Sequence, residues 1–117
     1  MRDHTKLRAF ELADELAVAV YNATRTFPKD EQFGLMSQMR RAAVSCASNI
    51  VEGSARNNES DYLRFLDMAY GSVREVEYQA SLAHRLGYLA ADAYASLRDR
   101  CVETSKVLGA LIRSLRS

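Results

Sequence analysis

The chain has 117 residues, of which 48% are hydrophobic and 26% are charged, and its formal net charge is +1. This composition is that of a folded globule and argues against a disordered chain. The length suits one domain, so we expect a single domain over residues 1–117 with enough apolar surface to form a core.

The sequence predicts neither a targeting signal nor a disulfide between its cysteines. The N-terminus, Met1-Arg2-Asp3-His4, lacks the apolar run of a signal peptide, and no stretch of about 18 apolar residues could span a bilayer. We therefore expect a cytoplasmic protein. Cys46 and Cys101 each sit among apolar residues at helical spacing, which predicts buried thiols and no disulfide framework.

Apolar residues recur with a helical period in four segments. The first predicted helix runs from about Leu7 to Arg25 and ends at Phe27-Pro28, because the residue before proline is pushed out of the α region. The second begins near Asp30 or Glu31, where acidic side chains complement the helix dipole, and residues 54–58 form a turn. The apolar lines of these two helices are Phe10, Ala13, Ala17, Val20 and Thr24, widened by Leu12 and Leu16, and Leu35, Met39, Ala42, Cys46, Ile50 and Gly53.

The third predicted helix ends at Leu86-Gly87, and the fourth begins at about Ala91. Their apolar lines are Tyr62, Phe65, Ala69, Val73, Val76, Ala80 and Ala83, and Leu97, Cys101, Thr104, Leu108, Leu111 and Leu115. Short connections force neighbouring helices to run in opposite directions. The sequence therefore predicts an all-α fold, an antiparallel up-down-up-down four-helix bundle.

Small residues on the second and third helices predict the closest helix contact inside the bundle. These residues are Ala42, Ala43, Ser45, Ala47 and Ser48, and Ala69, Gly71 and Ser72. Gly71 in mid-helix costs up to about 1 kcal/mol relative to alanine, so we expect close packing at that position to compensate.

Sites for catalysis, metals or cofactors are not predicted. His84 has no acidic residue three positions upstream, the cysteines and histidines lack chelating spacing, and no glycine-rich phosphate loop occurs. We expect His84 to be a partly exposed surface residue, and the protein to be a non-enzyme without metal or cofactor.

One side of the second predicted helix is polar without being a typical solvent face. Its members recur at steps of three and four residues and are Gln38, Arg41, Ser45, Asn49 and Glu52, followed by Arg56. A solvated face is one interpretation. The mixture of Asn and Ser with single charges also favours an interface with another helix or another subunit.

Arginine accounts for 13 of the 16 basic residues. Its planar donors suit phosphate and carboxylate oxygens, although a GC-rich gene would produce the same bias. From Leu97 onward, five basic residues face only two acidic ones. The candidates for binding nucleic-acid phosphates are Arg40, Arg41, Arg56, Arg98, Arg100, Arg113 and Arg116.

The order of short motifs resembles a known family over roughly Leu7 to Leu115. These motifs are Phe27-Pro28-Lys29-Asp30-Glu31-Gln32-Phe33-Gly34-Leu35, Gln38, Arg40-Arg41-Ala42, Ser45, Asn49-Ile50-Val51-Glu52-Gly53, Phe65-Leu66, Ala69, Gly71-Ser72, Glu75, Glu77 and Leu86-Gly87-Tyr88. The chain resembles the four-helix bundle proteins encoded within intervening sequences of bacterial 23S ribosomal RNA genes. That family is related to the accessory variability determinants of diversity-generating retroelements.

The resemblance implies a ring-shaped homopentamer, a role with nucleic acid and no established enzymatic activity. Three hypotheses follow. The protein is an oligomer that binds RNA or DNA through its arginines, a scaffold that presents a surface to a protein such as a polymerase, or an element-encoded passenger without a cellular ligand.

Overall fold

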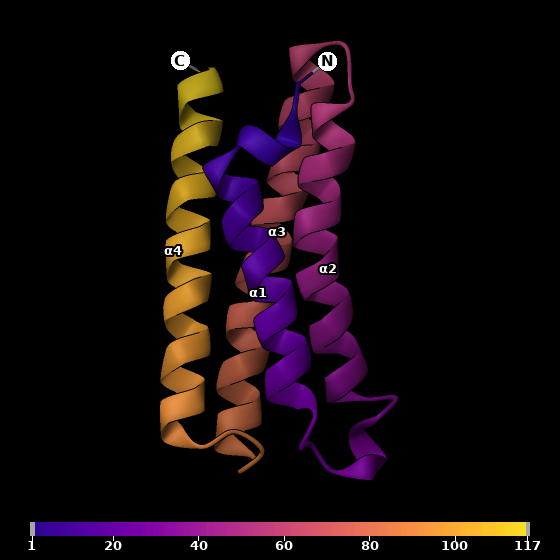
Figure 1. Cartoon of the computed structure of the whole chain (residues 1–117), viewed down its shortest axis with the longest axis vertical. Helices are drawn as coiled ribbons and strands as arrows, with labels where there is room; N and C mark the ends of the chain where they lie inside the picture. Colours follow the sequence, from indigo (N-terminus) through magenta and orange to yellow (C-terminus); the bar gives the residue numbers. More distant parts are fainter. Residues whose placement is uncertain (1, 117) are drawn as a thin grey trace.

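The computed structural model describes residues 2–116, and four α-helices dominate it. They are α1 (Arg8–Thr24), α2 (Leu35–Ser54), α3 (Glu59–Arg85) and α4 (Ala91–Arg116), with short 3₁₀ turns η1 (His4–Lys6) and η2 (Lys29–Glu31). No strand occurs among the described residues. The helices lie side by side in an elongated body of 43 × 23 × 19 Å (Figure 1). The all-α prediction is confirmed.

Each helix packs against two neighbours. In Figure 1, α4, α1 and α2 follow one another from left to right with α3 behind, and both termini lie at the upper end. The α1–α2 and α3–α4 connections lie at the lower end, and the α2–α3 connection lies at the upper end. Within the described residues, none of these helices is both long and apolar enough to cross a membrane.

A single core fills the space between the helices, and it matches most of the predicted apolar lines. Leu16, Met39, Ile50, Val76 and Leu108 are fully buried. The burial differs from the predicted lines at four positions. Phe10 and Ala17 of α1, and Leu111 and Leu115 of α4, are only partly buried, whereas Ile112 takes the buried position near the end of α4.

The end of α3 follows the predicted geometry. Gly87 adopts a positive φ of 83°, which favours glycine because it has no Cβ. The amide of Tyr88 donates to the carbonyl of Ala83 at 2.8 Å, and that of Gly87 donates to His84 at 3.0 Å. At the other end of the helix, the Asn58 side chain accepts the Asp61 amide at 2.8 Å.

The predicted start of α2 is wrong by about one helical turn. Residues 29–31 form η2, and α2 begins only at Leu35, after Gly34 with φ −110° and ψ −119°. Glu31 does lie at the helix N-terminus, but as a cap: its Oε1 accepts the Leu35 amide at 2.9 Å. Local hydrogen bonding by this side chain places the boundary four residues later than the charge pattern suggested.

The prediction for Gly71 is also wrong, and Gly53 is the glycine at which two helices approach closely. Gly71 is exposed, and a Cβ atom built there would meet nothing within 4 Å. A Cβ at Gly53 would lie 2.9 Å from Cβ of Phe65 and 3.2 Å from Cδ1 of Tyr62. Of the small residues predicted on α2, Ser45 does contact α3 through Ser72, but Gly71 points away from the contact.

Candidate functional site

The predicted polar stripe of α2 lies on the side of the helix that faces α3. Ser45 Oγ is 3.0 Å from Ser72 Oγ on α3, and a hydrogen bond joins the two hydroxyls. Asn49 Nδ2 donates to the carbonyl oxygen of Ser45 at 2.9 Å and to its Oγ at 3.0 Å. The middle of the stripe is therefore satisfied by contacts within the chain.

The charged members of the stripe differ in their surroundings. Glu52 pairs with Arg56 one turn later, at 3.0 Å. Arg41 is exposed and lines a polar surface groove together with Gln38, Ala42, Ser45 and Glu75 of α3. Among residues 2–116, no hydrogen-bond or ion-pair partner is found for the Arg41 guanidinium. Arg41 is thus the charge of the stripe that is open to another molecule.

A second, apolar strip runs along α2 beside the polar one, on the side of α1. Val44 is 41% exposed and Val51 is 38% exposed, one and three helical turns after Arg40 respectively. On α1, Val18 and Tyr21 are 59% and 42% exposed. We call these four residues, Val18, Tyr21, Val44 and Val51, the α1–α2 face.

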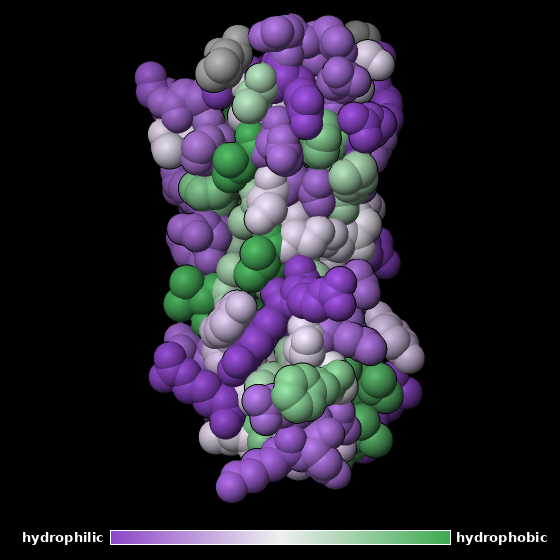
Figure 2. Space-filling model, turned by 90° about the vertical axis from the view of Figure 1, so that its right-hand side faces the viewer, coloured by the Kyte–Doolittle hydropathy of each residue, from purple (hydrophilic) through white to green (hydrophobic). Residues whose placement is uncertain are grey.

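Contacts of Arg40 join α2 to Tyr21 of α1, whereas Val18 lines the groove between α1 and α4. The Arg40 guanidinium lies 4.6 Å from the centroid of the Tyr21 ring, and its Nε donates to Thr24 Oγ1 at 2.9 Å. Arg40 Nη2 also donates to the Tyr21 carbonyl at 3.3 Å. Figure 2, which looks onto α2, shows a pale to green strip along the upper half of the long axis, and hydrophilic side chains interrupt it below the middle.

Sequence reasoning missed the α1–α2 face. One sequence feature could have indicated it. Val44 and Val51 are seven residues apart, so they lie on the same side of α2, and that side is not the one that carries the predicted core residues. Isolated exposed apolar residues are ordinary on protein surfaces, so only their proximity in the fold marks this set.

Most of the predicted phosphate-binding arginines are engaged inside the chain. Arg40 binds α1 as described, Arg56 pairs with Glu52, and Arg98 lies 3.5 Å from Asp99. Arg116 makes a two-pronged contact with Asp67 on α3, which raises the pKa of this guanidinium further. Such exposed pairs are weak and could exchange for a phosphate.

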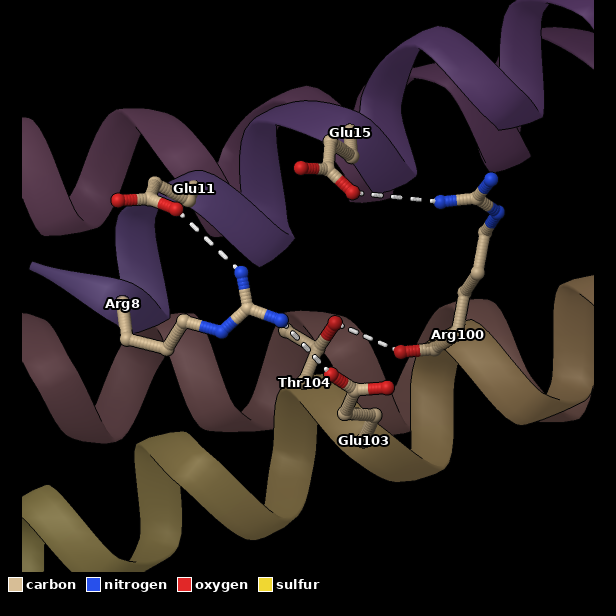
Figure 3. A network of polar contacts seen from close by, with 6 residues as sticks. All are labelled: Arg8, Glu11, Glu15, Arg100, Glu103 and Thr104. Carbon is tan, nitrogen blue, oxygen red and sulfur yellow. Dashed lines mark hydrogen bonds and ion pairs between the residues drawn. The ribbon is translucent and has the colours of Figure 1, made fainter.

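Arg100 belongs to a set of ion pairs between α1 and α4, drawn in Figure 3. Its Nη1 lies 3.6 Å from Oε1 of Glu15. One turn away, Arg8 lies 3.3 Å from Glu11 and 3.1 Å from Glu103, so it bridges the two helices. These side chains are about half exposed, and they fasten α1 to α4 rather than forming a basic patch.

Arg113 completes the predicted set. It is exposed near the end of α4, and within residues 2–116 no acidic partner is found for it. The seven arginines therefore lie on α2, the turn after it and α4, and within residues 2–116 no intrachain partner is found for two of them, Arg41 and Arg113.

The groups capable of covalent or metal chemistry are placed in the core or in structural contacts. Burial raises the pKa of both Cys46 and Cys101 to about 12, so neither thiol ionises readily. His84 is partly exposed, as predicted, and stacks on Tyr94 while its Nδ1 lies 2.9 Å from the Leu89 carbonyl. Over the part of the chain that the structure describes, no three His, Cys, Asp or Glu side chains gather as a metal site would require.

Comparison with known proteins places the chain in a family. None of the curated proteins compared with it matches. A solved structure from Bacteroides thetaiotaomicron VPI-5482, described as a protein with unknown function from the S23 ribosomal protein family, is similar with a TM-score of 0.82 and 24% identity. That similarity covers 90% of this chain and 95% of the other, and it supports the fold. The family model of the 23S rRNA-intervening sequence protein matches residues 5–110, so the chain belongs to this family.

Proposed function

We propose that the protein is a non-enzymatic helical scaffold that acts as an assembly of copies, each an antiparallel up-down-up-down four-helix bundle. The observation that carries this proposal is the α1–α2 face. Four large apolar side chains, each at least 38% exposed, lie on the two adjacent helices α1 and α2, and Arg41, for which no partner is found among residues 2–116, precedes Val44 by one turn. Exposed apolar patches with polar borders are typical of protein–protein contacts.

The non-enzymatic part of the proposal is supported by the thiols and by the grooves. A thiol with a pKa of about 12 is a poor nucleophile at neutral pH. The groove between α1 and α4 is lined by Val18, Leu97 and several small residues, together with the acidic Asp14 and Glu15 and the paired Arg100. Such a surface suits packing better than catalysis.

Nucleic-acid binding is the second candidate function, and two observations favour it. The family is named for intervening sequences of 23S rRNA, and Arg41 and Arg113 present guanidinium groups that no described side chain neutralises. One copy offers few such groups. A ring of copies, pentameric if it follows the family resemblance, would repeat both and multiply the phosphate contacts.

Light scattering coupled to size exclusion tests the main proposal. We expect the purified chain, in cytoplasm-like buffer near neutral pH, to have a mass of two or more copies at concentrations of about 10–100 µM, the range of weak protein contacts. A mass of one copy throughout that range would overturn the scaffold proposal. Anisotropy titrations with RNA and single-stranded DNA at several salt concentrations test the second candidate. Binding that is absent at about 50 mM salt, or that does not weaken as salt rises, would exclude it.

A further inference from the structure

Tyrosine and arginine side chains alternate along the side of the bundle where α3 meets α4. On α3 they recur at steps of four or seven residues, so they lie on one side of that helix. Two contacts place this side at the junction with α4: Asp67 binds Arg116, and a groove of about 310 Å³ is lined by both Tyr78 and Tyr94. We call this set the α3–α4 face, and its members are Tyr70, Arg74, Tyr78 and Arg85 of α3, and Tyr94, Arg98, Arg113 and Arg116 of α4.

Gly109 of α4 lets an arginine lie close to an aromatic ring on this face. A Cβ atom built at Gly109 would lie 3.3 Å from Arg113 Nη1 and 3.5 Å from Tyr70 Cε2. The Arg113 guanidinium therefore lies back along α4, on the side of Tyr70. Arg74 Nη1 donates to the Tyr70 hydroxyl at 3.4 Å. The Tyr70 ring thus has a guanidinium group from each helix beside it.

Tyr78 is the most open ring of the face. Its side chain is 60% exposed, and within residues 2–116 no hydrogen bond of its hydroxyl is found. Across the groove, Tyr94 stacks on His84 with a centroid distance of 4.8 Å, and the Arg98 guanidinium lies 5.8 Å from the Tyr94 centroid. The volume of the groove is at the lower end of the range for small-molecule sites, which suits one planar ring. Tyr94 is therefore held in place, whereas Tyr78 can accept another ring.

Positive charge is in excess on the α3–α4 face. Three of its arginines pair with acidic side chains on or next to the face, and these pairs are Asp67–Arg116, Glu77–Arg74 and Asp99–Arg98. Arg85 donates only to the Ser81 carbonyl, at 3.3 Å, and within residues 2–116 no ion-pair partner is found for Arg85 or Arg113. Glu59, an exposed acidic residue in the same surface groove as Arg116, limits the positive surface at its upper end.

We propose that the α3–α4 face binds single-stranded nucleic acid, with a base stacked on Tyr78 and phosphates along the arginines. Surfaces that bind single strands combine cationic groups that follow the backbone with aromatic rings on which bases stack. This face has both over about 33 Å, the length of α4 from Tyr94 to Arg116 at 1.5 Å per residue. Val102 is the one large aliphatic side chain exposed beside the face within residues 2–116, which favours nucleic acid over a protein partner.

This inference rests on the second candidate function and gives it a surface and a substrate class. The bases of a duplex are already stacked on one another, so a duplex would have to unstack before it could use the Tyr78 ring. Arg41, the other arginine without a partner in the described residues, lies on α2 and takes no part in this face. Binding through phosphates alone would leave the candidate function standing and would contradict the stacking described here.

Fluorescence of a single indole tests the stacking directly. The chain contains no tryptophan, so Tyr78→Trp introduces the only indole. We expect single-stranded RNA and single-stranded DNA of the same sequence to quench its emission as they bind, and the two titrations show which is preferred. Inorganic polyphosphate, which has the charge but no bases, should leave the emission unchanged, and a duplex should quench less. Saturable binding of a single strand without quenching overturns the proposal.

Affinities of three further variants provide an independent measurement, with circular dichroism to verify helix content. Tyr78→Ala should weaken binding of a single-stranded oligonucleotide by at least about fivefold, the loss of one base stack. Tyr78→Phe keeps the ring and should bind nearly as the unmodified chain does. Phe33→Ala is the matched control, because this exposed ring lies in the α1–α2 connection, outside the face. Unchanged affinity of Tyr78→Ala, or an equal loss in Tyr78→Phe, contradicts the stacking, whereas absence of binding by the unmodified chain removes the candidate function itself.

Discussion

The phenol of Tyr88 donates a hydrogen bond of 2.8 Å to Oε2 of Glu31, although the two residues are 57 positions apart in the chain. The other oxygen of the same carboxylate accepts the Leu35 amide at the start of α2. Phe27 packs against the Tyr88 ring with a centroid distance of 5.4 Å. One carboxylate thus fastens the α1–α2 connection, the first turn of α2 and the α3–α4 connection to one another.

Protonation of Glu31 should loosen this end of the molecule. The hydrogen bonds from the Leu35 amide and from Tyr88 lower the pKa of the Glu31 carboxyl in the folded state. A lowered folded-state pKa stabilises the fold above the pKa of the unfolded chain, about 4.3, and this contribution is lost as the pH falls through the folded value. We expect Glu31→Gln to unfold at lower urea concentration than the unmodified chain at pH 7, and the difference to shrink towards pH 3.

Tyr88→Phe is the matched variant, since it keeps the ring and removes one donor. The hydrogen bond to Glu31 raises the pKa of Tyr88. The stability that this hydrogen bond contributes is therefore present below about pH 10, the pKa of an unfolded tyrosine, and is lost as the phenol ionises at higher pH. If Glu31→Gln lost the same stability at pH 3 as at pH 7, the charge-assisted contact would not be its cause.

The extent to which the sequence predicted this structure depends on how local each signal is. Apolar residues at helical spacing predicted four helices and most of the core, and Leu86-Gly87 predicted the end of α3, because these signals act within a few residues. The start of α2 was missed because the Glu31 side chain reaches the Leu35 amide, and charge pattern alone does not distinguish a capping carboxylate from a first-turn residue.

The candidate site could be predicted only in part. The polar stripe of α2 follows from spacing, and the structure places it along α3. Which charges are neutralised does not follow from spacing, since Arg116 finds Asp67 and Arg100 finds Glu15 on other helices. The α1–α2 face could not be predicted either, because it joins residues of two helices whose relative rotation is set by core packing.

Gly53 and Gly71 should respond in opposite ways to alanine. At Gly53 the new methyl group would lie 2.9 Å from Cβ of Phe65 and must displace it. We expect Gly53→Ala to lower the free energy of unfolding by about 1–2 kcal/mol, the cost of overpacking reduced by the helix preference of alanine. At Gly71 the methyl group would meet nothing within 4 Å, so Gly71→Ala should raise the free energy of unfolding by up to about 1 kcal/mol. Urea unfolding measures both, and a stabilising Gly53→Ala would contradict the close approach of α2 and α3.

The buried thiols should make stability depend on alkaline pH. Burial raises the pKa of Cys46 and Cys101 to about 12, whereas an unfolded cysteine ionises near pH 8.5. A raised folded-state pKa gives a contribution to stability that is complete below the unfolded pKa and is lost as the pH rises through the folded value. We expect the urea midpoint to fall from pH 8 to pH 11, and both thiols to react with Ellman's reagent at pH 8 only as fast as the chain unfolds. Rapid reaction of either thiol without denaturant would show that it is accessible.

Arg113 and Arg116 provide a matched pair for the nucleic-acid hypothesis, because they lie one turn apart on α4 and only Arg116 is held by Asp67. If the protein binds nucleic acid through its unpartnered arginines, Arg113→Ala should weaken binding to single-stranded RNA. It should also reduce the slope of log affinity against log salt by about 0.7–0.9 for each phosphate that the variant no longer neutralises. Arg116→Ala should have a smaller effect, since its guanidinium must first leave a carboxylate.

Neither Arg113 nor Arg116 lies on the α1–α2 face, so the mass of the assembly should stay the same in both variants and serves as the control. Equal reductions in affinity for the two variants would mean that the ion pair with Asp67 does not restrain Arg116. Unchanged binding by Arg113→Ala would show that the Arg113 guanidinium, for which no partner is found among residues 2–116, contributes nothing to a nucleic-acid surface at this end of α4.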